Sequence, residues 1–108
     1  MISIIVPTHN NAKTITKCLD SIFGQTYQDI EVIVVNDGST DATGQVLENY
    51  RSRIKIINQT NQGAPVARNN GFAESVGEYL FFCDADIIFK PDALEKLVQK
   101  LEENPDAA

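Results

Sequence analysis

A nearly continuous apolar run, Ile30–Val35, constrains the fold of this chain more than any other feature. A strand with apolar side chains on both faces must be covered on both sides, as in parallel sheets flanked by helices. Shorter β-rich segments occur at Ser3–Pro7, Ile54–Ile57 and Tyr79–Cys83. We therefore expect these four segments to form one buried, mainly parallel sheet.

Amphipathic segments lie between the predicted strands. Apolar residues recur at helical spacing within Ile15–Phe23, and Gly24 ends the repeat. We expect further helices through Val46–Tyr50, from Gly63–Pro65 onward, and after Pro91–Asp92. Because strands and helices alternate, the sequence predicts an α/β fold with a doubly wound sheet, right-handed crossovers and helices on both faces.

Composition excludes several classes of protein. The 108 residues suit one domain, and the net charge of -6 with scattered basic residues argues against a nucleic-acid partner. Cys18 and Cys83 form no Cys-x-x-Cys pattern, which favours reduced thiols in a cytoplasmic protein, with a disulfide as the alternative. No apolar run approaches the roughly 20 residues of a membrane span. If the full-length parent is membrane-associated, we expect its anchor elsewhere.

Polar clusters follow the predicted strands, at the sheet edge where open α/β sheets bind ligands. The first is Pro7-Thr8-His9-Asn10. In the functional interpretation, the loop backbone and His9 bind a nucleobase. Alternatively, Thr8 and Asn10 simply end the strand, with Asn10–Asn11 capping the next helix. His9 is the only histidine, which excludes a His-rich metal site.

The second cluster, Asn36–Asp41, centres on Asp37. Asp37-Gly38 reads as a turn, and Thr40 or Ser39 as a helix cap. Asp37 also stands where a ligand would lie. A carboxylate only accepts hydrogen bonds, so it suits the N3–H of uracil or the N1–H of guanine and repels the N1 acceptor of adenine. This favours a pyrimidine ligand.

The third cluster places Arg68 in a helix of small residues, Ala64, Ala67 and Gly71. Small residues allow close approach, and an arginine among them is suited to clamp a diphosphate with two parallel hydrogen bonds. The alternative is a surface arginine paired with an acid such as Glu74.

The fourth cluster is Asp84-Ala85-Asp86, directly after a buried strand. A hard divalent cation is usually held by one or two carboxylates together with substrate phosphates. The alternative is two merely solvated acids. On one sheet edge with Asp37 and Arg68, the pair points to a site for a diphosphate and a metal.

Four motifs together resemble the inverting family 2 glycosyltransferases of the GT-A fold. They are Ile5–Asn10, Val35–Asp41, Asn61–Gly71 and Asp84–Asp86, in the family's order and over nearly the whole chain. The resemblance implies that residues 1–108 are the Rossmann-like, nucleotide-sugar-binding part of a GT-A domain.

The resemblance also implies roles for single residues. Asp37 would read the base, Arg68 would contact the nucleotide or its phosphates, and Asp84 would face the ribose. Asp86 would coordinate Mg²⁺ or Mn²⁺ on the diphosphate. The predicted nucleotide-binding residues are Pro7, Thr8, His9, Asn10, Asp37, Gly38, Arg68, Asp84 and Ala85, with Asp86 as the metal ligand.

Two departures from the family pattern stand out. Many members have Tyr at His9, so base stacking is expected to be weaker here, and many carry a further acid at Ile87. We expect the general base and the site for a sugar, lipid or protein acceptor to lie beyond Ala108. The chain is thus predicted to bind a UDP-sugar but to transfer it poorly.

The fourth strand and Ile87-Ile88-Phe89 show no partner in the preceding sequence. An open sheet edge invites pairing, so we expect self-association into a homo-oligomer.

Other functions are open at this point. A phosphatase of the haloacid-dehalogenase type also has Asp-x-Asp after an apolar strand, but normally at the start of its domain, and it leaves Asp37 and Arg68 unexplained. A dinucleotide-dependent oxidoreductase is disfavoured because no Gly-x-Gly-x-x-Gly follows the first strand. A non-catalytic nucleotide-binding or assembly module is the third possibility.

Overall fold

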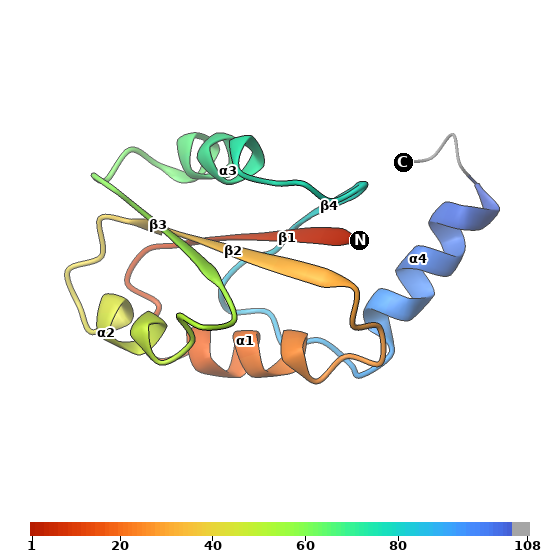
Figure 1. Ribbon diagram of the computed structural model, residues 1–108. Coiled ribbons are helices and arrows are strands. Elements are labelled where there is room, and N and C mark those ends of the chain that lie inside the picture. Colours follow the sequence, from red (N-terminus) through yellow and green to blue (C-terminus); the bar gives the residue numbers. More distant parts are fainter. Residues whose placement is uncertain (105–108) are drawn as a thin grey trace.

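Four strands alternate with four helices in the computed structural model, which describes residues 1–104 (Figure 1). Their order is β1 (Ile2–Thr8), α1 (Ile15–Phe23), β2 (Ile30–Asp37), α2 (Thr43–Glu48), β3 (Lys55–Gln59), α3 (Ala64–Ala73), β4 (Tyr79–Phe82) and α4 (Ala93–Glu103).

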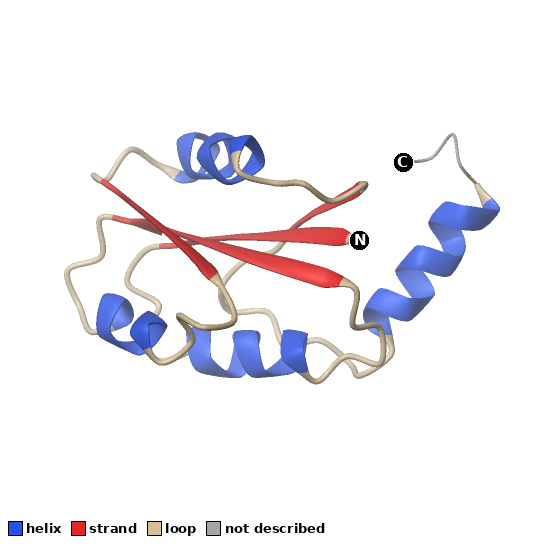
Figure 2. Cartoon of the chain, viewed as in Figure 1, coloured by secondary structure: helices blue, strands red, loops and turns tan. Residues whose placement is uncertain are grey.

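The four strands form one parallel sheet in the order β3-β2-β1-β4. Helices α1 and α2 lie on one side of the sheet and α3 on the other (Figure 2). The predicted doubly wound α/β architecture is therefore confirmed. The parallel register also brings the carboxyl ends of β1, β2 and β3 to one edge, where Thr8 pairs with Asn36 and Asp37 with Gln59.

The core has two layers because alternate side chains of each strand face opposite sides of the sheet. On the α1 side, Val34 of β2 belongs to one cluster with Leu19 and Ile22. On the α3 side, Ile33 and Val35 pack with Ile5 and Ala67. The apolar run that predicted a sheet covered on both faces is thus buried on both faces.

Helix α3 packs very closely on the sheet. A Cβ atom added to Gly71 would lie 2.5 Å from Ile5 Cγ2 and 3.3 Å from Val35 Cγ2. Only a residue without a side chain fits here, and Ala67 lies fully buried one turn earlier. This close packing fixes the position of the helix that carries Arg68.

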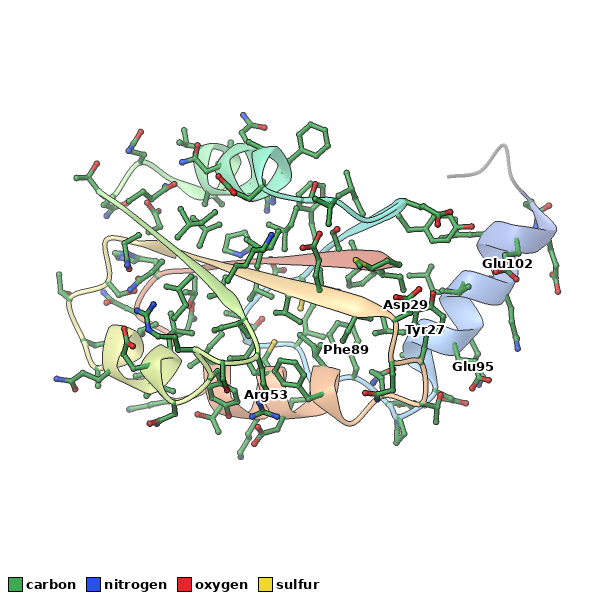
Figure 3. The ribbon with its side chains drawn as sticks, in the orientation of Figure 1. Tyr27, Asp29, Arg53, Phe89, Glu95 and Glu102 are labelled. Carbon is green, nitrogen blue, oxygen red and sulfur yellow. The ribbon has the colours of Figure 1, made fainter. Side chains whose placement is uncertain are left out.

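The segment from β4 to α4 is anchored on α1. Phe89 lies between the sheet and α1 (Figure 3), its ring 5.7 Å from that of Phe81 and its N–H 3.0 Å from Ser21 Oγ. The expectation that Phe89 lacks a partner in the preceding sequence is therefore wrong. Buried Gln25 completes the anchor, because its amide donates to the Lys90 carbonyl and accepts from the Leu94 N–H.

The predicted helix cap at Asn10–Asn11 is also wrong. Helix α1 begins four residues later, after Thr14, and Asn10 adopts a left-handed conformation with φ of 54°. Helix α2 has Ala42 at its N-cap, without a side-chain cap, and Asp41 just before it accepts the Thr43 N–H at 2.9 Å. Among the helices within residues 1–104, none has the length and apolar character needed to cross a membrane.

Candidate functional site

The loops after β1 and β2 are joined by hydrogen bonds of Asn10. Its side-chain oxygen accepts the N–H groups of Thr40 at 2.8 Å and Asp41 at 3.2 Å. Its own N–H donates to Ser39 Oγ at 3.0 Å. Asparagine tolerates the left-handed conformation that this arrangement needs. These contacts hold the two loops together at the carboxyl edge of the sheet.

Thr8 points into the same network. It is 2% exposed, and its hydroxyl donates to Asn11 Oδ1 at 2.7 Å. The same Asn11 oxygen accepts the His9 N–H at 3.0 Å. Nucleotide contacts of Thr8 and Asn10 stay predictions, and the structure gives both side chains a role in fixing the loops.

The His9 ring is held in one orientation. Its Nδ1 lies 2.6 Å from the Asp37 carbonyl oxygen. Because a carbonyl only accepts, Nδ1 must carry the proton, and in the neutral ring Nε2 is then the acceptor. Asn10 Nδ2 lies 3.3 Å from Nε2 and can donate to it. His9 thus connects the two loops beside Asp37 while its side chain stays exposed.

Asp37 is buried, with 5% of its surface exposed, and accepts three hydrogen bonds. Oδ1 accepts the Gln62 N–H at 2.7 Å and the Gln59 amide at 2.9 Å, and Oδ2 accepts the Gly63 N–H at 3.0 Å. The Gln62 N–H, and after it the Gln59 amide, hold the pKa of Asp37 below its usual value despite burial. The carboxylate is therefore ionised near neutral pH.

Asp37 lines a small cavity of about 110 Å³ together with Pro7, Thr8, His9 and Ala64. The structure thus brings together the base-binding residues predicted from two separate motifs. Gly38 closes the adjoining turn at φ of 64°, and an added Cβ would lie 2.7 Å from the Asn61 N atom. A side chain at position 38 would clash with the Asn61 backbone, so this turn requires glycine.

Arg68 lies one helical turn after Ala64 on α3, and residues four apart share a helix face. Its side chain is half-buried. The alternative pairing with Glu74 is absent from the ion pairs within residues 1–104. Arg68 therefore shares a helix face with Ala64, which lines the 110 Å³ cavity, although Arg68 itself is not among the lining residues.

Asp84 and Asp86 follow β4 with exposed side chains, while Ala85 between them is buried. Cys83 continues the strand pairing by donating its N–H to the Ile5 carbonyl at 2.9 Å, which carries the acids to the carboxyl edge. They do not line the 110 Å³ cavity. The thiol of Cys83 donates a hydrogen bond to the Asp84 carbonyl oxygen, with 3.2 Å between the sulfur and oxygen atoms.

Cys18 and Cys83 are both free and buried, with 3.8 Å between their sulfur atoms. They pack in the core beneath the Asp84-Ala85-Asp86 turn.

The donor set suits a hard cation that shares its ligands with a phosphate. In the part of the chain that the structure describes, no three His, Cys, Asp or Glu side chains are grouped to hold a metal. Two exposed carboxylates supply hard oxygen ligands but too few for a complete site. Mg²⁺ and Mn²⁺ fit such a site if phosphate oxygens and water complete the coordination.

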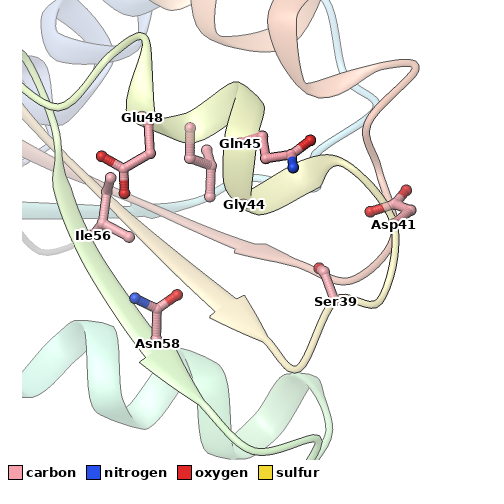
Figure 4. A pocket seen from close by; sticks show the side chains of 8 residues that line it. Ser39, Asp41, Gly44, Gln45, Glu48, Ile56 and Asn58 are labelled. Carbon is pink, nitrogen blue, oxygen red and sulfur yellow. The ribbon is translucent and has the colours of Figure 1, made fainter.

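A larger hollow of about 360 Å³ lies between α2 and β3 (Figure 4). Its acids are already engaged, since Asp41 accepts from Thr43 and Glu48 pairs with Arg51 at 2.6 Å. The smaller cavity lies at the carboxyl ends of β1 and β2, where open α/β sheets bind ligands, and we place the candidate site there.

Sequence reasoning missed two residues of the site, Gln59 and Asn70. Asn70 Nδ2 donates to Gln59 Oε1 at 2.6 Å, and Gln59 in turn donates to Asp37. A signal was present: Gln59 is two residues after Ile57, which packs in the α3-side core, so a polar side chain faces the helix.

A parallel, doubly wound α/β sheet with its polar loops gathered at the carboxyl edge defines a Rossmann-like domain. The chain matches the family model for glycosyl transferase family 2 over residues 3–108. It therefore belongs to glycosyl transferase family 2. This membership favours a transferase over the phosphatase alternative.

Similar proteins include two glycosyltransferases of Streptococcus pneumoniae serotype 4. GlyA is 44% identical over 105 residues, which cover 94% of this chain and 15% of GlyA. GlyG is 38% identical over 107 residues, covering 95% of this chain and 36% of GlyG. The chain thus spans much less than half of the length of these relatives.

Two solved structures are similar in fold. S. aureus TarS 1–349 in complex with UDP has a TM-score of 0.87 and 36% identity, covering 94% of this chain and 32% of that one. The mannosyltransferase PcManGT from Pyrobaculum calidifontis, in complex with GDP-Man and Mn²⁺, has a TM-score of 0.88 and 29% identity, covering 93% and 32%.

Proposed function

We propose that this chain binds a UDP-sugar together with Mg²⁺ or Mn²⁺, as the donor-binding part of an inverting glycosyltransferase. The observation that carries the proposal is Asp37, a buried and ionised carboxylate beside a cavity at the carboxyl edge. Such a group accepts hydrogen bonds only, and it therefore prefers a base that presents an N–H, as uracil does at N3. The TarS complex with UDP supports the same base.

The diphosphate would lie between Arg68 and the acids after β4. Asp86, with Asp84 beside it, would hold the cation. When bound, a divalent cation neutralises charge that develops on the leaving diphosphate. Arg68 would bind phosphate oxygens, and exposed Asp84 would accept from a ribose hydroxyl. The structure of PcManGT in complex with GDP-Man and Mn²⁺ supports the use of a divalent metal.

Transfer needs a general base for the acceptor hydroxyl, and we propose that residues 1–108 do not provide it. This chain covers 15% and 36% of GlyA and GlyG. The sugar, lipid or protein acceptor would bind to a later part of a longer protein. Isolated residues 1–108 would then bind UDP-sugar without transferring the sugar, and efficient transfer to an acceptor by this chain alone would refute this part of the proposal.

A panel of nucleoside diphosphates tests the base preference. At a concentration 100 times its Kd, a ligand stabilises the folded protein by about 2.7 kcal/mol, which raises the melting temperature by on the order of 10 °C for this size of domain. We expect UDP with Mn²⁺ to give such a rise and ADP to give little. Equal stabilisation by UDP and ADP would refute base reading by Asp37.

We also propose that two copies of the chain pair through β4. Within residues 1–104, β4 is an edge strand, and Leu80 and Phe82 are 41% and 46% exposed. A twofold axis would pair the two β4 edges and cover these side chains. Light scattering at high concentration should detect a dimer, and a monomer would contradict the pairing. A cytoplasmic location stays a prediction from the sequence.

A further inference from the structure

We propose that Gln59 and Asn70 are positioning residues that set the base preference of Asp37. Asn70 Nδ2 lies 2.6 Å from Gln59 Oε1, and Gln59 Nε2 lies 2.9 Å from Asp37 Oδ1. The three side chains form a hydrogen-bonded chain, here called the amide chain, from α3 through β3 to the end of β2. This inference rests on the proposed function, because it concerns how Asp37 selects uracil.

The direction of every hydrogen bond in the amide chain is fixed by the carboxylate at its end. Ionised Asp37 can only accept, so Gln59 must turn its NH₂ group toward it. Gln59 Oε1 then faces α3 and needs a donor, which Asn70 supplies. Gln59 and Asn70 are both half-buried. Asn70 therefore stabilises the same orientation of the Gln59 amide that the Asp37 carboxylate requires.

Three donors occupy most of the acceptor positions of the Asp37 carboxylate. Oδ1 receives two hydrogen bonds, from the Gln62 N–H and the Gln59 amide. Oδ2 receives one, from the Gly63 N–H. A carboxylate oxygen has about two acceptor positions, so one position remains on Oδ2. The fixed carboxylate can take the N3–H of uracil there and repels N3 of cytosine, which is an acceptor.

Reversal of the Gln59 amide would remove this selectivity. Its carbonyl oxygen would then face Asp37, and the repulsion would displace the carboxylate or favour its protonation. A protonated Asp37 can donate to N3 of cytosine. The ratio of UDP affinity to CDP affinity therefore reports the orientation of the Gln59 amide. If Gln59 and Asn70 had a purely structural role, this ratio would not change when they are substituted.

Asn70→Asp tests this directly, because a carboxylate at that position cannot donate to Gln59 Oε1 and attracts its NH₂ group. The matched control is Asn69→Asp, which adds the same charge at the neighbouring, exposed helix position. Titration calorimetry with Mn²⁺ and UDP or CDP gives both affinities. We expect Asn70→Asp to lower the UDP-to-CDP ratio by about tenfold or more, the size of one hydrogen bond to a charged group. Asn69→Asp should keep the wild-type ratio.

A double-mutant cycle provides the second readout. In a Gln59→Met background the amide is gone, so adding Asn70→Asp should change the ratio no further. If Asn70→Asp does not fold, Gln59→Glu is the alternative variant and should lower the ratio in the same way. Wild-type protein that fails to bind UDP would refute the proposed function. Wild-type protein that binds UDP, with equal ratios for Asn70→Asp and Asn69→Asp, would overturn the inference alone.

Discussion

Asp37→Asn should destabilise the fold although it barely changes side-chain volume. Two of the three donors meet at Oδ1 and the third at Oδ2. An asparagine keeps most hydrogen bonds with its oxygen at the Oδ1 position, toward Gln62 and Gln59. Its NH₂ group then faces the Gly63 N–H, so two donors oppose each other. The two surviving hydrogen bonds also lose their charge.

The expected loss in unfolding free energy follows from the burial of Asp37. Asp37 is 5% exposed, and the NH₂ group of an asparagine would stand where Oδ2 now accepts the Gly63 N–H. A hydrogen bond to a charged group contributes about 1.5–3 kcal/mol, and this is our estimate of the loss in unfolding free energy. At about 4 °C per kcal/mol for a domain of this size, the melting temperature should fall by roughly 6–12 °C.

Thermal unfolding followed by circular dichroism at pH 7 measures this effect. Asp84→Asn is the matched control, because its side chain is exposed and surface changes usually stay within about 0.5 kcal/mol. The pH dependence is a second check. The pKa of Asp37 is lowered in the folded state, so its contribution is complete above the ordinary aspartate pKa and is lost as pH falls through the lower folded value. Wild type and Asp37→Asn should therefore converge in acid. Equal melting temperatures at pH 7 would refute the assigned hydrogen bonds.

Three further predictions follow from the packing. Gly71→Ala should cost about 1–3 kcal/mol, because its methyl group would lie 2.5 Å from a methyl group of Ile5, and chemical denaturation measures the loss. Gln25→Leu should loosen the start of α4, because the buried Gln25 amide forms hydrogen bonds with backbone groups there. We expect the amides of α4 to exchange hydrogen faster than in wild type, and unchanged exchange would contradict this role of Gln25. The thiols of Cys18 and Cys83 should react with a thiol reagent only after unfolding, because both are buried; rapid reaction of the native protein would count against the core packing.

The sheet could be predicted from the sequence because burial on both faces leaves a local pattern. The run from Val32 to Val35 is apolar at every position, and its side chains alternate between the two core clusters. Asp37 could also be located, since it directly follows that run. For these residues, the position along a single strand is enough to predict whether the side chain is buried or lies at the carboxyl end of the sheet.

The contacts of Asn10 and Gln59 could not be predicted in the same way. Asn10 was expected to act on the helix that follows it, but its partners Thr40 and Asp41 lie about thirty residues later. Gln59 contacts Asp37 and Asn70 on two other elements. These partners depend on strand register and on how α3 sits on the sheet, which no local pattern encodes.

Metal-dependent UDP binding tests the central claim most directly. Titration calorimetry of the wild-type chain with UDP, with and without Mn²⁺, should show binding that Mn²⁺ strengthens. Asp86→Ala should remove that strengthening, because the carboxylate assigned to the cation is gone, while weak metal-independent binding through Asp37 persists. Binding of UDP that is equally tight with and without Mn²⁺, and unchanged in Asp86→Ala, would contradict the assignment of a diphosphate and metal site to this edge of the sheet.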